Sequence, residues 1–339
     1  MLNAVQNQQD AMPAPGLNFI DKLFDIEVPP EVRNRAQIRT VAPGADTPPS
    51  NPHYVFTKDQ MLILQFWIND EGKDGQKTNL MLTGPTGSGK TSLIEQLAAR
   101  IGFGCIKVPC HGELEFEDLI GTRTLNESGG MMWVDGPVTR AMRNGSILLF
   151  DEINFLRPEV VGGLNTILDG GSFLISATSE RVMPHPNFRI AATGNAIDGT
   201  DAGKYRGTRR QNDSLLDRFL LGIRLDYMPA EQERALLQGM YPRLDSQVIE
   251  VMMDVTTATR ESQRSNDLSV AISTRVLLNG WARQVHRQTT PERQAENILS
   301  ALQTTMLFRV PDQDRTMISN TVTQLLQRKQ LLKQAPSNS

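Results

Sequence analysis

An eight-residue glycine-rich motif constrains this chain more than any other feature of its sequence. Residues 84–91 read Gly-Pro-Thr-Gly-Ser-Gly-Lys-Thr, which fits the pattern G-x-x-x-x-G-K-[ST]. A short apolar run at 79–83 comes before the motif, and residues 91–101 follow it with apolar side chains at helical spacing. Glycines let the loop turn its N–H groups toward a phosphate, and the helix that follows adds the positive end of its dipole. This context favours a phosphate-binding loop in an α/β fold over a chance match.

The motif also predicts which residues hold a nucleoside triphosphate. Lys90 can reach the β- and γ-phosphates, and the Thr91 hydroxyl can ligate Mg²⁺. The expected nucleotide-binding residues are Gly84, Pro85, Thr86, Gly87, Ser88, Gly89, Lys90, Thr91 and Ser92.

A second strand ends in two acids. The apolar run 147–150 is followed directly by Asp151 and Glu152. Parallel strands deliver their C-terminal residues to the edge of the sheet where ligands bind. We therefore expect Asp151 to hold Mg²⁺, directly or through water, and Glu152 to orient and polarise the attacking water. The alternative is a strand that simply ends in solvated acids.

Two further polar residues lie at the ends of predicted elements. Asn195 comes after the apolar run 188–193 and could hydrogen-bond the attacking water or the γ-phosphate, although an asparagine after Gly194 is also typical of a turn. Arg275 begins a predicted helix in the C-terminal region, from which it could reach the nucleotide, or it could be a solvated helix arginine.

A third candidate for contact with the nucleotide is an arginine supplied by a neighbouring subunit. Arg218 stands just before the predicted strand 219–225, where its guanidinium could neutralise transition-state charge on another protomer's nucleotide. A surface salt bridge with Asp217 is the alternative. Arg209 and Arg210 compete for the same role.

Strands and helices alternate through the middle of the chain, which predicts an open, mostly parallel sheet covered on both faces. After residue 229 the strand signals stop and helical patterns follow. The expected strands are 79–83, 105–108, 146–150, 188–193 and 219–225, and the expected late helices are 231–240, 247–260, 273–286, 291–307 and 316–332.

This pattern predicts four parts. Residues 1–53 form a disordered tail (1–17) and an extended proline-containing arm, residues 54–227 an α/β nucleotide-binding domain, residues 228–333 a helical lid domain, and residues 334–339 a second tail.

Composition narrows the class of protein. The formal net charge of −3 argues against a nucleic-acid binder that works through bulk positive charge. We see no apolar run that could span a bilayer and no signal-peptide h-region, so we expect a cytoplasmic protein without membrane insertion. Cys105 and Cys110 with His111 could suggest a metal, but buried free thiols are the favoured interpretation.

Taken together, these motifs resemble the AAA+ ATPases, over about residues 54–310, and most of all the branch of MoxR-type ATPases and metal-chelatase ATPase subunits. The resemblance implies ATP and Mg²⁺, a P-loop (Walker A) at 84–91, a Walker B pair at Asp151 and Glu152, and sensor 1 at Asn195. It also implies an arginine finger at Arg218 and sensor 2 at Arg275. Residues 118–137 and 173–182 look like the two hairpin insertions of this branch, which contact the client.

Residues 24–29, 52–56 and 184–189 are most similar to the CobS-like ATPase subunits of aerobic cobaltochelatases. The Walker B tail Glu152-Ile-Asn154 is closer to the general MoxR pattern, and Ser-Thr-Arg stands at 273–275 where Ser-Pro-Arg is usual. The resemblance implies a homo-oligomeric ring, expected to have six subunits, that remodels a partner with a von Willebrand A-type (VWA) domain. A cobaltochelatase ATPase is the alternative, and a nucleic-acid motor is less favoured.

Overall fold

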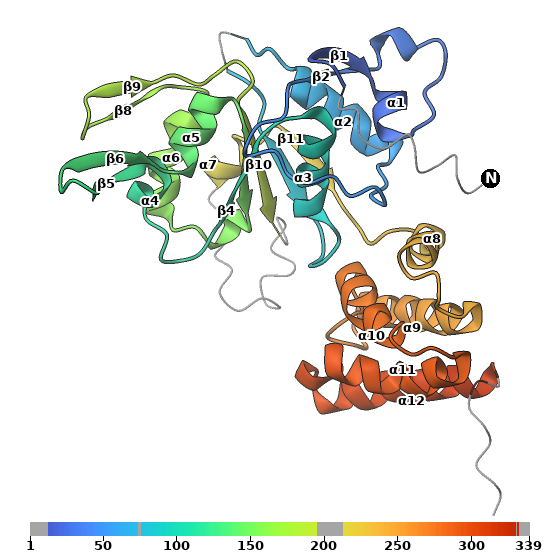
Figure 1. Ribbon diagram of the computed structural model, residues 1–339. Coiled ribbons are helices and arrows are strands. Elements are labelled where there is room, and N and C mark those ends of the chain that lie inside the picture. The colour runs from blue at the N-terminus through green and yellow to red at the C-terminus, as the bar shows by residue number, and fades with distance from the viewer. Residues whose placement is uncertain (1–12, 74–75, 195–212, 330, 332–339) are drawn as a thin grey trace, which may run out of the picture. The chain divides into compact units, whose positions relative to one another are not determined.

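The computed structural model describes residues 13–73, 76–194, 213–329 and 331 of the 339-residue chain (Figure 1). The chain divides into two compact units. The first consists of Met1–Gly84 and Lys90–Leu225, and the second of Pro85–Gly89 and Asp226–Ser339. Residues Pro85–Gly89 of the phosphate loop therefore belong to the second unit, whereas Gly84, Lys90 and Thr91 belong to the first.

A five-stranded sheet forms the centre of the first unit. Its strands follow the order β11-β3-β10-β7-β4, and every neighbouring pair is parallel. The strands are β3 (Leu80–Thr83), β4 (Cys105–Pro109), β7 (Ile147–Asp151), β10 (Arg189–Gly194) and β11 (Leu221–Arg224). The predicted parallel α/β sheet is thereby confirmed.

An apolar core covers each face of the sheet. Successive residues of a strand point to opposite faces and so belong to different cores. In β3, Leu80 and Leu82 belong to one apolar core, whereas Met81 belongs to the other. The first core includes residues of helices α2 (Lys58–Asn69) and α3 (Lys90–Ile101). The second core includes residues of helices α5 (Pro137–Asn144) and α6 (Pro158–Leu168).

The segment before α2 is more structured than the extended arm expected from its prolines. Strand β1 (Gly16–Phe19) pairs antiparallel with β2 (Gln37–Thr40), and a helix α1 (Ile20–Phe24) and a 3₁₀ turn η1 (Arg33–Arg35) lie between them. Apolar residues of this segment, Phe24 and Ile38 among them, join the core beside α2 and α3. The sequence interpretation of 1–17 as a tail thus differs from the structure at Gly16 and Leu17, and residues 1–12 lie outside the described part.

Two hairpins interrupt the α/β pattern where insertions were expected. The first, β5 (Gly121–Leu125) with β6 (Met131–Asp135), lies between α4 (Phe116–Ile120) and α5. The second pairs β8 (Phe173–Ile175) with β9 (Glu180–Val182) after α6. Figure 1 shows both hairpins extending from the same side of the first unit, and Arg123 of the first hairpin donates a hydrogen bond to the Ala177 carbonyl of the second. Two short elements complete this unit, the 3₁₀ turn η2 (Ile153–Phe155) and helix α7 (Asp213–Leu216).

The second unit is helical and has its own apolar core. The expected helix 273–286 differs in type: Val276–Ala282 form a π-helix, in which hydrogen bonds close over five residues, and a short α-helix follows it. The elements are α8 (Ala230–Met240), α9 (Ser246–Arg264), η3 (Val276–Ala282), α10 (Arg283–Val285), α11 (Pro291–Thr305), the 3₁₀ turn η4 (Leu307–Arg309) and α12 (Asp312–Arg328). In the described residues, we find no helix that combines the length and the apolar character required to cross a membrane.

Candidate active site

The phosphate loop begins at a position that only glycine can occupy. Gly84 has φ +139°, and a Cβ built there would lie 1.8 Å from the carbonyl oxygen of Leu225. Gly87 and Gly89 also have positive φ values, +78° and +98°, which L side chains rarely adopt. The three glycines of the motif therefore allow the curled backbone that phosphate binding requires.

Lys90 is the first residue of α3, and its side chain bends back to the start of the loop. Its ammonium group donates a hydrogen bond to the Gly84 carbonyl at 2.9 Å, and only 7% of the residue is exposed. The Ser88 hydroxyl of the same loop is buried, and it has no hydrogen-bond partner among the described residues. A buried hydroxyl of this kind is costly unless a further group binds it.

Asp151, the last residue of β7, is hydrogen-bonded to helix α3 and to the neighbouring strand β10. The Thr91 hydroxyl donates to Asp151 Oδ1 at 2.7 Å, and the hydroxyl of Thr193, the fifth residue of β10, donates to the same oxygen at 2.7 Å. Thr193 is fully buried, so this hydrogen bond is shielded from water. The predicted phosphate loop and the predicted acidic strand end thus meet at one carboxylate oxygen.

Glu152 follows at a sharp turn of the backbone. Its φ of +60° is in the left-handed region, which is uncommon for a residue with a side chain and concentrates at functional sites. Its amide donates to the Thr193 hydroxyl at 2.9 Å, so Thr193 accepts from Glu152 and donates to Asp151. This turn follows the last residue of β7, Asp151.

Sequence reasoning missed two polar residues of this region. The sequence placed Thr193 only at the end of a predicted strand. In the structure its hydroxyl bonds the side chain of Asp151 and the backbone of Glu152. A hydroxyl residue beside Gly194 was the available signal. Asn154 lies two residues after Glu152, is 5% exposed, and its Oδ1 has no partner in the described part of the chain. That oxygen lies 3.9 Å from where a Cβ of Gly194 would be.

The donor set at Asp151 fits a magnesium ion. A carboxylate and a hydroxyl, joined by the 2.7 Å hydrogen bond from Thr91, are the hard oxygen ligands that Mg²⁺ accepts while it keeps waters and substrate phosphates. No cluster of three or more His, Cys, Asp or Glu residues suited to a metal occurs in the residues the structure describes.

Arg218 is held within its own protomer. Its guanidinium contacts both oxygens of Asp169, at 2.9 and 3.3 Å, and donates to the carbonyl and hydroxyl oxygens of Ser214. The backbone carbonyl of Arg218 accepts a bond from the buried amide of Asn79, which also donates to Leu168. Arg218 thus forms its ion pair with Asp169, which is distant in sequence, and not with Asp217, the partner considered from the sequence.

Arg275 belongs to the helical unit and is exposed. Within that unit, a Cβ placed on Gly87 would lie 2.7 Å from the Ser273 hydroxyl and 3.4 Å from Arg275 Cβ. The residues around the sensor 2 candidate therefore lie against the middle of the phosphate loop. Asn195, Arg209 and Arg210 fall outside the described residues, so the structure does not place them.

Both cysteines are free thiols: Cys105 begins β4, at the far end of the sheet from Asp151, and the amide of Cys110 donates to the Asp151 carbonyl. Burial raises the pKa of Cys105 to about 12, and burial also raises the pKa of Cys110, with the nearby Asp151 and Glu152 adding to the shift. Thiols that remain protonated at neutral pH are poor metal ligands and poor nucleophiles.

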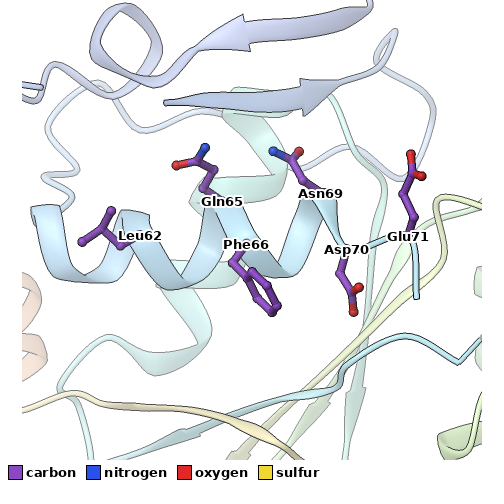
Figure 2. A pocket seen from close by; sticks show the side chains of 6 residues that line it. All are labelled: Leu62, Gln65, Phe66, Asn69, Asp70 and Glu71. Carbon is purple, nitrogen blue, oxygen red and sulfur yellow. The ribbon is translucent and has the colours of Figure 1, made fainter. Parts of the chain in front are cut away.

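A pocket on α2 lies apart from all of these residues. Figure 2 shows its lining, which consists of Leu62, Gln65, Phe66, Asn69, Asp70 and Glu71. None of the residues predicted from the motifs belongs to it.

The sequence is similar to those of known proteins. Residues 79–219 match the family described as AAA domain (dynein-related subfamily). The chain is 28% identical to the aerobic cobaltochelatase subunit CobS of Sinorhizobium sp over 71% of this chain and 74% of that protein. It is 35% identical to an uncharacterized protein of Staphylococcus haemolyticus, over 59% of this chain and 76% of that protein. It is 32% identical to one of Staphylococcus epidermidis, over 66% and 89%.

Proposed function

Because this chain belongs to the AAA ATPases, in the branch of the dynein-related and MoxR proteins, we propose that it couples Mg²⁺-dependent ATP hydrolysis to the remodelling of a protein partner. The partner class expected for this branch carries a VWA domain. The observation that supports the chemistry best is the pair of hydroxyl donors on Asp151. They place the start of α3, the end of β7 and the end of β10 within hydrogen-bond distance of one another.

The phosphates are bound by the loop. The loop amides and Lys90 hold the β- and γ-phosphates, and the ammonium group exchanges its bond to the Gly84 carbonyl for phosphate oxygens. The buried Ser88 hydroxyl gains a partner when the loop is filled. Thr91 and Asp151 would hold Mg²⁺, which would supply positive charge beside the phosphates.

Glu152 acts on the water. The strand ends at Asp151 and the backbone turns at Glu152 with φ +60°, and we assign the two neighbouring carboxylates different tasks. Glu152 accepts a proton from the attacking water as general base, and Asn195 orients that water or the γ-phosphate. Thr193 fixes the backbone of Glu152 while it fixes the side chain of Asp151.

The active unit is a homo-oligomer, for which the family suggests a ring of six. Arg218 precedes β11, which is an edge strand of the sheet. Leu220, two residues after Arg218, is 75% exposed. On helix α2, which packs against β11, Leu62 and Phe66 are 64% and 57% exposed. An apolar surface at this edge suits contact with a neighbouring protomer, whose nucleotide Arg218 would then reach.

Replacing Glu152 with Gln tests this function. The variant keeps the shape and the backbone bond to Thr193 but removes the base, so we expect ATP binding to persist while turnover falls at least about 100-fold. Glu296→Gln, on the exposed face of α11, is the matched control and is expected to hydrolyse ATP normally. Capture of partners on the ATP-loaded Glu152→Gln protein then identifies the client.

A cobaltochelatase ATPase is the second candidate, and the 28% identity to CobS over 71% of the chain favours it. This function requires a separate subunit that binds the corrin ring. Reconstitution with the remaining subunits of an aerobic cobaltochelatase, followed by measurement of cobalt insertion, decides between the two. ATPase activity without insertion supports general remodelling.

A further inference from the structure

A buried ion pair joins two helices of the helical unit. Arg260 of α9 contacts Glu233 of α8 through two hydrogen bonds, of 2.7 and 2.8 Å. Glu233 is fully buried, and Arg260 is 8% exposed. A pair buried this deeply adds little net stability compared with apolar side chains of the same volume. We therefore ask which parts of the chain its hydrogen bonds hold in place.

Both members of the pair reach the segment that carries Arg275. Arg260 Nε donates to the Ile272 carbonyl at 3.0 Å. The Thr274 hydroxyl donates to Glu233 Oε1. These bonds hold the backbone of Ile272 and the side chain of Thr274, on the two sides of Ser273, and Arg275 is the next residue along the chain.

The same arginine also faces the chain that leads into this unit. The Arg260 guanidinium lies 4.2 Å from the centroid of the Tyr227 ring, a cation–π distance. The Tyr227 hydroxyl lies 3.4 Å from the Thr86 carbonyl of the phosphate loop. Within this unit, Arg260 therefore connects the loop residues, through Tyr227, with the segment before Arg275.

We propose that Glu233 and Arg260 are positioning residues that hold residues 272–275 so that Arg275 faces the phosphate loop. The proposal rests on the proposed ATPase function and assigns this task to residues outside the phosphate loop and the acidic strand end. Thr274 transmits the effect, because its hydroxyl is the link between Glu233 and the residue next to Arg275.

Thr274 is also the residue at which the proposal can be tested. Removing Glu233 or Arg260 would leave an unpaired buried charge and could unfold the helical unit. Thr274→Val removes the hydroxyl and keeps the shape of the side chain, and Thr274→Ser keeps the hydroxyl. We expect Thr274→Val to lower kcat about fivefold, the size of effect that one hydrogen bond supplies, with KM for ATP changed less than about twofold. We expect Thr274→Ser to recover the loss.

A double substitution shows whether the effect passes through Arg275. If it does, Thr274→Val combined with Arg275→Ala turns over no more slowly than Arg275→Ala alone. A wild-type kcat for Thr274→Val would overturn the proposal, and so would losses that multiply in the double variant. An Arg275→Ala protein with unchanged turnover would overturn it as well.

Hydrogen exchange separates this inference from the proposed function. We expect the amides of residues 272–276 to exchange faster in Thr274→Val than in the unchanged protein, with or without ATP turnover. Unchanged exchange would contradict the holding role of the pair. Absence of ATP hydrolysis by the unchanged protein would overturn the proposed function, and the exchange result would still decide whether the pair holds the segment.

Discussion

The hydroxyl of Thr193 donates to Asp151 Oδ1 at 2.7 Å and accepts from the amide of Glu152 at 2.9 Å. One side chain on β10 thus fixes the carboxylate proposed to hold the metal and the backbone of the proposed base. Thr193 is fully buried, whereas Asp151 and Glu152 are half-buried, so these bonds lie at the boundary of the core.

Removing this hydroxyl should therefore affect both stability and turnover. We expect Thr193→Val to lower the free energy of unfolding by about 1–2 kcal/mol and to slow ATP hydrolysis about tenfold, since the Glu152 amide and Asp151 each lose a partner. Thr193→Ser keeps the hydroxyl and should retain most of both. Denaturant unfolding and steady-state ATPase assays measure the two effects; a valine variant as active as the serine variant would contradict this role.

The start of the phosphate loop should not tolerate a side chain. Gly84→Ala combines a φ of +139° with a Cβ that would meet the Leu225 carbonyl at 1.8 Å. We expect a loss of about 3 kcal/mol or more in unfolding free energy, together with loss of ATP binding. Gly44→Ala is the matched control, because open space surrounds that exposed glycine; its effect should stay within about 0.5 kcal/mol. Similar melting temperatures for the two variants would show that the loop can move aside.

Lys77 predicts a pH dependence of stability. Burial, together with the nearby Arg189 and Arg39, lowers the pKa of Lys77 from 10.5 to about 8. Between pH 8 and 10.5 the unfolded chain then binds more protons at this lysine than the folded chain, so the lysine's contribution to folding becomes more favourable as pH rises. Relative to Lys77→Met, the unchanged protein should gain stability across this window. Parallel stability curves for the two proteins would mean that the lysine has an ordinary pKa.

Arg218 should act on a neighbouring protomer's nucleotide. In a single chain its guanidinium is paired with Asp169 and Ser214, so trans catalysis requires it to exchange these partners at an interface. We expect Arg218→Ala to lose turnover while it still binds ATP. Mixing it with Glu152→Gln should restore part of the activity, because some sites then combine an intact Glu152 with a neighbour's Arg218. Mixtures that remain inactive, although the two variants assemble together, would rule out this role.

The strand and helix pattern could be predicted because the buried parallel strands are short apolar runs, such as 79–83 and 147–150, bounded by glycine or acidic residues. The meeting of Thr91 with Asp151 also followed from general principles, since parallel strand ends share one edge of the sheet.

Other features depend on contacts that no local pattern reports. Thr193 is an ordinary strand residue until β10 is placed beside β7. The pairing of β1 with β2 spans a segment whose prolines suggested only an extended arm, and the core beside α3 supplies the apolar surface that orders it. Likewise, the partner of Arg218 is Asp169, which the fold brings close from the end of α6.

A structure of the Glu152→Gln protein with ATP and Mg²⁺ tests the central claim most directly. The account predicts the γ-phosphate within hydrogen-bond distance of Lys90 Nζ, with the metal ion between that phosphate and the oxygens of Thr91 and Asp151. Nucleotide bound elsewhere, or bound in the loop with Asp151 and residue 152 turned away from the γ-phosphate, would contradict it.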